Sequence, residues 1–91
     1  MGKSNILFKT KELKARSEIA AFMKQLAEKI DQGKVTLKAG SEDVALELPD
    51  DLMLEVEVDV KEKQAKGKQH TLEVEIKWYE KGFERGKLEL G

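Results

Sequence analysis

Apolar and charged residues alternate without interruption along residues 72–78, a segment that ends in a tryptophan. The same alternation runs along residues 52–60, where Met53 alone stands at a position otherwise held by a charged residue. Alternation with a period of two is typical of a β-strand that turns one face to a core and the other to water. The two segments therefore predict strands with one apolar and one densely charged face.

A different period appears over residues 17–32, where apolar residues recur at three- and four-residue spacing. This spacing predicts an amphipathic helix. Ser17 stands where an N-cap would be, Glu18 falls in the first turn, and Gly33 follows as the C-cap. The apolar stripe of this helix needs a partner surface, and we expect it to pack on the apolar face of the strands.

Two shorter alternating segments lie between the helix and the long strands. Residues 35–39 and 44–48 flank the turn residues 40–42, and this arrangement predicts a hairpin. Near the N-terminus, residues 5–12 show a weaker alternation that predicts one more short strand.

The sequence also predicts the connections between the later strands. Pro49 and the two aspartates after it predict a tight turn that pairs the strand before it with the strand that starts at Leu52. Residues 61–69 contain one apolar residue, Ala65, and predict an exposed loop before the last strand.

Together these elements predict the α+β class, with one amphipathic helix, about 17–32, packed on one face of a four- to five-stranded, mainly antiparallel meander sheet. A chain of 91 residues suits a single modest core, so we expect one domain over residues 1–79 and a loosely held tail over 80–91. The predicted structural core includes Phe22, Leu26, Val56, Val74 and Trp78.

Charge is distributed unevenly along the chain. Residues 1–40 carry nine Lys and Arg against four acids (+5), and residues 41–80 carry five against twelve (−7). The chain has no cysteine, which excludes disulfides and thiolate chemistry, and no signal-peptide or membrane-spanning apolar stretch. We therefore expect a soluble, cytoplasmic protein that does not associate with membranes.

Four stretches carry a resemblance to a known family: Ser17–Phe22 in the helix, Gly33–Leu37, the turn Leu46–Asp50, and the amphipathic strand that ends at Trp78. In this order and spacing they resemble the amphi-Trp domain, a family named for that strand and its tryptophan. The resemblance covers roughly residues 5–79. It implies a small α+β domain and brings no reaction, ligand or catalytic residue.

The residue inventory argues against catalysis. Acyl transfer needs a nucleophile with a base, and most metal hydrolases need grouped His or Cys ligands. The chain has a single histidine, His70, which the pattern places at the mouth of the last strand beside the loop. We therefore expect a protein that is not an enzyme and holds no cofactor or metal.

The charged face of the long strands is the sharpest candidate for function. Counting from the turn and the loop places Glu57 opposite Glu73 and Glu55 opposite Glu75. Registers shifted by two residues also oppose acids, so every register that keeps the apolar faces aligned contains such pairs. These four glutamates form the predicted acidic face.

Two interpretations of the acidic face are open. In the first, water, salt, and the nearby Lys38 and Lys77 screen a face that has no further role. In the second, the face is a platform for a basic protein partner or, less well supported, a divalent cation. Exposed strand carboxylates lack the enclosing loop of strong cation sites.

A basic surface offers an alternative function. The loop between the long strands carries Lys61, Lys63, Lys66 and Lys68. The segment before the helix carries Lys9, Lys11, Lys14 and Arg16. Together they would suit a nucleic-acid partner. The net charge of −1 and the lack of aromatic residues among the lysines favour a solvated loop instead.

Self-association is the third possibility. Sheet edges at residues 70–79 and 34–38 would invite pairing unless charged side chains protect them. Lys34, Lys38 and Lys77 suit that protective role, so we expect a monomer or a weak homodimer.

Overall fold

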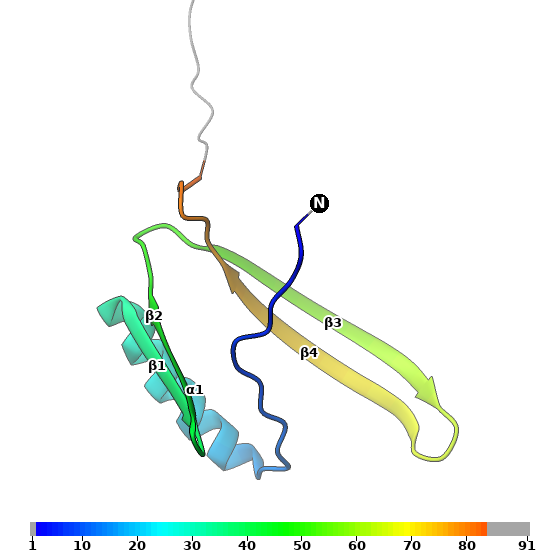
Figure 1. The fold of residues 1–91 in the computed structure, drawn as a ribbon. Coiled ribbons are helices and arrows are strands. Elements are labelled where there is room, and N and C mark those ends of the chain that lie inside the picture. Colours follow the sequence, from blue (N-terminus) through cyan, green and yellow to red (C-terminus); the bar gives the residue numbers. More distant parts are fainter. Residues whose placement is uncertain (1, 84–91) are drawn as a thin grey trace, which may run out of the picture. The chain divides into compact units, whose positions relative to one another are not determined.

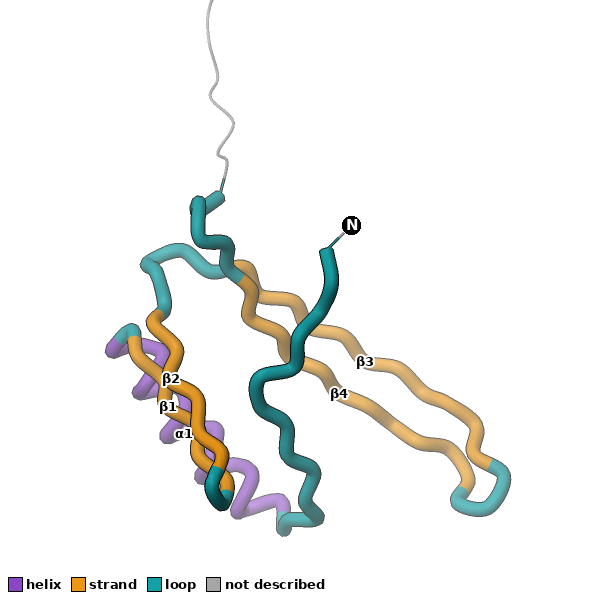
Figure 2. Tube along the Cα trace, viewed as in Figure 1, coloured by secondary structure: helices purple, strands orange, loops and turns teal. Residues whose placement is uncertain are grey.

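The structure is a computed structural model that describes residues 2–83 of the chain. Its elements, shown in Figure 1 and by type in Figure 2, are α1 (Arg16–Gln32), β1 (Lys34–Ala39), β2 (Glu42–Glu47), β3 (Met53–Lys63) and β4 (Gly67–Lys77). The chain divides into two units. Met1–Leu48 contains the helix and the first hairpin, and Pro49–Gly91 contains the second hairpin.

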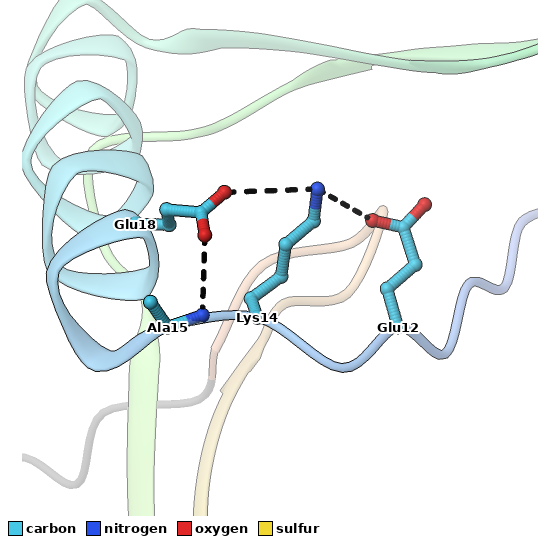
Figure 3. A network of polar contacts seen from close by, with 4 residues as sticks. All are labelled: Glu12, Lys14, Ala15 and Glu18. Carbon is cyan, nitrogen blue, oxygen red and sulfur yellow. Dashed lines mark hydrogen bonds and ion pairs between the residues drawn. The ribbon is translucent and has the colours of Figure 1, made fainter.

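The N-terminus of α1 differs from the sequence prediction. The N-cap is Ala15, and Ser17 is the second residue inside the helix. Alanine has no side-chain acceptor, so the helix uses the reverse half of a capping box: the backbone N–H of Ala15 donates to Oε1 of Glu18 at 3.2 Å (Figure 3). The prediction of Ser17 as the cap was therefore wrong, because a carboxylate three residues inside the cap anchors this end.

The C-terminus of α1 follows the prediction. Gly33 adopts the left-handed conformation (φ 83°), and its N–H donates to the carbonyls of Ile30 and Lys29. Its own carbonyl accepts from the N–H of Leu48 at 2.8 Å. This hydrogen bond connects the end of the helix to the residue that directly follows β2.

The first unit packs α1 against the β1–β2 hairpin, as Figure 1 shows. The strands pair antiparallel from Lys34 opposite Glu47 to Ala39 opposite Glu42, which confirms the predicted hairpin. Val35 is the one buried residue of the described chain, at 5% exposure. The small core of this unit therefore centres on β1, the strand that α1 contacts.

The second unit is an antiparallel ribbon of two strands, each 11 residues long. Its register places Glu57 opposite Glu73 and Val60 opposite His70, which confirms the predicted pairing. The loop predicted over residues 61–69 was wrong, because pairing continues to Lys63 opposite Gly67. Backbone pairing needs no apolar side chains, and Gly67 (φ 77°) provides the left-handed residue that a short hairpin loop requires.

The single meander sheet is not confirmed, because the four strands form two sheets of two strands each. The predicted turn at Pro49 does not pair β2 with β3: residues 48–52 lie outside any strand. The Leu48 N–H donates to Gly33 instead, and proline has no N–H to contribute to a ladder.

The short N-terminal strand was also wrong, because residues 2–15 form no strand or helix (Figure 2). Ile6 and Leu7 are 75% and 73% exposed, so neither side of this segment is covered by a core. Two adjacent exposed apolar residues break the alternation on which the prediction depended.

The residues of the predicted core differ in burial. Leu26 and Trp78 are half-buried, whereas Phe22, Val56 and Val74 are 49%, 58% and 57% exposed. A two-stranded ribbon forms a single layer, and residues 49–83 of its unit supply no second layer over the apolar face. In the first unit, a hairpin of two strands covers less of the helix stripe than a wide sheet would.

Candidate functional site

The acidic face consists of Glu55, Glu57, Glu73 and Glu75, and the register of the second hairpin brings them together. Glu55 lies opposite Glu75, and Glu57 lies opposite Glu73. Directly opposed side chains in an antiparallel pair have Cβ atoms about 4.5–5.5 Å apart. Four carboxylates therefore share one face of the ribbon, and the valines and leucines of the same strands occupy the other.

Lys77 compensates the outer pair of carboxylates. Its Nζ lies 3.3 Å from Oε2 of Glu55 and 3.2 Å from Oε2 of Glu75. Hydrogen bonding to Lys77, and then to Glu55, lowers the pKa of Glu75 below its usual value. The same contacts, first with Glu75 and then with Glu55, raise the pKa of Lys77. The outer end of the acidic face is thus an ion-pair cluster.

The inner pair, Glu57 and Glu73, has no such compensation. Among residues 2–83, neither carboxylate forms an ion pair or a side-chain hydrogen bond. The next position along β3 adds Asp59, which lies opposite Thr71. The structure therefore concentrates uncompensated negative charge at the middle of the ribbon.

The predicted screening lysines do not behave alike. Lys77 contacts the acidic face as described, whereas Lys38 lies in β1, opposite Asp43, and belongs to the other sheet. The prediction that Lys38 neighbours the acidic strands depended on a single meander and is not confirmed.

The four lysines of the predicted basic loop are distributed over β3, the turn and β4, because both strands extend further than predicted. Lys61 and Lys63 are the next two residues after Asp59 on the charged face of β3. Lys68 lies on the opposite face, across from Glu62, and Lys66 is in the turn. The four lysines thus surround the hairpin tip and do not form a single basic surface.

The basic segment before the helix is partly compensated. Lys14 Nζ lies 3.3 Å from Oε2 of Glu12 and 4.0 Å from Oε2 of Glu18 (Figure 3). For Lys9, Lys11 and Arg16, the described chain shows no ion pair. One of the cations proposed for nucleic acid therefore belongs to the helix cap.

Comparison with known proteins adds one decisive match: the family model of the Amphi-Trp domain matches residues 1–91. The chain belongs to the amphi-Trp domain family. The match extends beyond the predicted resemblance over 5–79 and includes the segment expected to be a tail. No curated protein and no solved structure matches this amphi-Trp domain.

The tryptophan of this amphi-Trp domain follows its amphipathic strand, as the resemblance implies. β4 ends at Lys77, and Trp78 is the next residue, half-buried. Beyond it, the Tyr79 and Phe83 rings meet edge to face, with centroids 5.4 Å apart and planes at 78°. The left-handed Gly82 closes the turn between the two rings, and its N–H donates to the Tyr79 carbonyl at 2.9 Å.

No catalytic or metal centre emerges from the part of the chain that the structure describes. His70 lies within β4, opposite Val60, and not at the strand's mouth, because β4 begins at Gly67. Among the described residues, no three His, Cys, Asp or Glu side chains group as metal ligands. The helix of this amphi-Trp domain, α1, is neither long nor apolar enough to cross a bilayer. The remainder of the predicted tail, residues 84–91, lies outside the described residues.

Proposed function

We propose that this amphi-Trp domain is a cytoplasmic, non-catalytic binding module that presents its acidic face to a basic protein partner. The observation that supports the proposal most is the direct opposition of Glu57 and Glu73 with no cation beside them in the described chain. A directly opposed like-charged pair costs about 0.2–1 kcal/mol of stability. A partner that supplies a cation would convert this cost into attraction.

The chemistry of the face favours arginine or lysine as the contacting residues. An arginine guanidinium donates two parallel hydrogen bonds to a carboxylate, and it loses less hydration than an ammonium group when it does so. Because Lys77 already occupies the Glu55 end, the partner's cation belongs near Glu57 and Glu73. The side chain of Asp59, on the same face, extends the site toward the hairpin tip.

The non-catalytic part of the proposal is supported by the residue inventory. With one histidine and no cysteine, the chain has few of the groups that act as activated nucleophiles or general bases. The exposed His70 has an aliphatic residue, Val60, as its cross-strand neighbour.

The proposal is tested with Glu57→Gln plus Glu73→Gln, and with Glu28→Gln plus Asp31→Gln on α1 as a control of equal charge change. Binding of arginine-rich and lysine-rich peptides is measured by isothermal titration calorimetry at two salt concentrations. We expect the first variant to lose binding, the control to keep it, and salt to weaken it.

A lysate capture with and without nuclease then asks which proteins bind. One protein retained after nuclease treatment and lost from the Glu57 and Glu73 variant would support the acidic face. A raised melting temperature of that variant with every binding measurement unchanged would contradict the proposal, because the repulsion would then have no role in recognition.

The alternative is nucleic-acid binding through the basic segment before the helix together with four lysines of the second hairpin, Lys61, Lys63, Lys66 and Lys68. Its support is that none of these lysines forms an ion pair within residues 2–83. Fluorescence anisotropy with a single-stranded oligonucleotide tests it against a variant with all four changed to Gln. Absence of binding at low salt would exclude this alternative.

A further inference from the structure

β3 has an edge that pairs with no strand among the described residues. Its backbone bonds to β4 on one side, and the sheet has no third strand. The pairing with β4 runs from Met53 to Lys63 without interruption, and β3 contains no proline. A long regular edge of this kind exposes a row of N–H and C=O groups that can pair with another strand.

Charge along this edge is segregated by sign. On the charged face of β3, the first half carries Glu55, Glu57 and Asp59, and the second half carries Lys61 and Lys63. A strand that is acidic at one end and basic at the other is complementary to an antiparallel copy of itself. A two-fold axis produces this arrangement, because a residue before the axis then meets a residue after it in the copy, and the same pair is repeated by symmetry.

The charges also select a register. With the axis at Val60, Lys61 lies opposite Asp59 of the second copy and Lys63 lies opposite its Glu57, and symmetry repeats both pairs. An axis at Asp59 would oppose the two Asp59 residues. An axis at Val58 would oppose Glu57 to Asp59. Of these three registers, only the one with the axis at Val60 pairs opposite charges without also pairing like charges.

The edge of β4 lacks this complementarity. If two copies of β4 paired antiparallel over their whole length, the two-fold axis would lie at Leu72. Glu73 would then lie opposite Thr71 of the second copy, and Glu75 opposite its Gln69. This pairing therefore forms no opposite-charge pair on the charged face. The charge pattern thus favours the edge of β3.

We propose that two copies of the chain pair through their β3 edges, antiparallel about Val60, and form a four-stranded sheet in the order β4–β3–β3–β4. Isolated two-stranded ribbons are marginally stable, and a wider sheet is more stable. The pairing places Lys63 of the second copy beside Glu57 and relieves its repulsion with Glu73. It leaves Glu73 free for a partner and does not depend on the proposed function.

The absence of cysteine makes a direct test possible with Val60→Cys. At the axis the two Cα atoms would lie about 4.5–5.5 Å apart, which is within the range that a disulfide spans. Val58→Cys is the matched control: its two copies are offset by four residues, roughly 13 Å. Leu72→Cys is a second control, because its cross-linking would indicate that two chains pair through their β4 edges.

Under mild oxidation, we expect Val60→Cys to form covalent dimers much faster than either control, as measured on non-reducing gels. Equal rates for Val60→Cys and Val58→Cys would overturn the proposed register. Preferential cross-linking of Leu72→Cys would overturn the proposal in favour of the β4 edge.

Charge reversal provides a second, independent test by sedimentation velocity. On the charged face of the paired segment 57–63, Lys61→Glu plus Lys63→Glu makes every charge acidic, and Glu57→Lys plus Asp59→Lys makes every charge basic. We expect each variant alone to lose the dimer and an equimolar mixture to regain it. The basic variant places a lysine opposite Glu73, so its loss of the dimer cannot result from a weakened hairpin.

Glu73→Lys is the control, because it changes the charge of β4 and leaves the β3 edge intact; it should keep the dimer. A wild-type protein that stays monomeric at its highest attainable concentration would overturn the proposal. A mixture of the two variants that remains monomeric would also overturn it.

Discussion

Lys77, at the end of β4, reaches across to β3 and donates a hydrogen bond of 3.3 Å to Oε2 of Glu55. Its direct cross-strand neighbour is Met53, so this contact is diagonal. The same ammonium group lies 3.2 Å from Glu75. A single cation therefore holds two carboxylates that face each other, and this determines how the stability of the hairpin depends on pH.

The pH dependence follows from the two pKa shifts. The pKa of Glu75 is lowered from 4.5, so its contribution to stability is present above pH 4.5 and is lost as pH falls through the lowered pKa. The pKa of Lys77 is raised from 10.5, so its contribution is present below pH 10.5 and is lost as pH rises through the raised pKa. Between these limits both groups stabilise the folded hairpin.

We therefore expect Lys77→Gln to lower the urea midpoint of unfolding at neutral pH and to have a smaller effect at both extremes. Urea titrations of the wild type and the variant, repeated across the pH range, measure this difference. A difference that is constant with pH would contradict the ion-pair cluster. The effect should be modest, because all three side chains are about half exposed.

The two acidic pairs should respond differently to neutralisation. Glu57→Gln removes one charge of a pair that is uncompensated in the monomer, so at protein concentrations where the chain is monomeric we expect the melting temperature to rise by the equivalent of about 0.2–1 kcal/mol. Glu55→Gln removes a carboxylate that Lys77 contacts, so we expect no gain or a small loss. Thermal melts by circular dichroism compare the two. Equal rises in melting temperature for the two variants would show that Lys77 does not compensate the Glu55–Glu75 pair in solution.

The residue pattern predicted the first hairpin and the register of the two long strands, but not the length of the second hairpin. Alternation defines which side chains share a face, and a two-residue shift preserves the apolar face, so at least one pair of acids had to face each other in any of these registers. Counting residues across the connection between the strands then gave Glu73 as the cross-strand neighbour of Glu57, as the structure confirms. For the same reason the acidic face itself was predictable.

The division into two sheets was not predictable from the same pattern. Which strand edges pair depends on backbone hydrogen bonds, and the side chains of Leu48 and Leu52 carry no information about them. Lys61 and Lys63 looked like loop residues because their side chains are polar, yet their backbone continues β3. The selection of Glu55 over Glu57 by Lys77 likewise depends on the reach of one side chain.

The conformation of Gly33 is the basis of a further prediction. Its φ of 83° places it in the left-handed region, where a Cβ costs roughly 1–2 kcal/mol. A Cβ at Gly33 would lie 3.7 Å from the Leu48 carbonyl, an ordinary contact, so the cost arises from the backbone and not from crowding. Urea unfolding should show Gly33→Ala destabilised by about that amount. Gly33→Asn should lose less, since asparagine tolerates this region, and equal losses would contradict the backbone explanation.

Burial separates two valines that occupy similar positions in the sequence pattern. Val35 is 5% exposed beneath α1, and Val58 is 69% exposed on the ribbon. Val35→Ala removes two buried carbons and leaves a cavity, so we expect a loss of about 2 kcal/mol. Val58→Ala should cost well under half of that at protein concentrations where the chain is monomeric. Denaturant titrations at low concentration measure both, and a Val58→Ala loss as large as that of Val35→Ala would show that the apolar face of the ribbon is covered in solution.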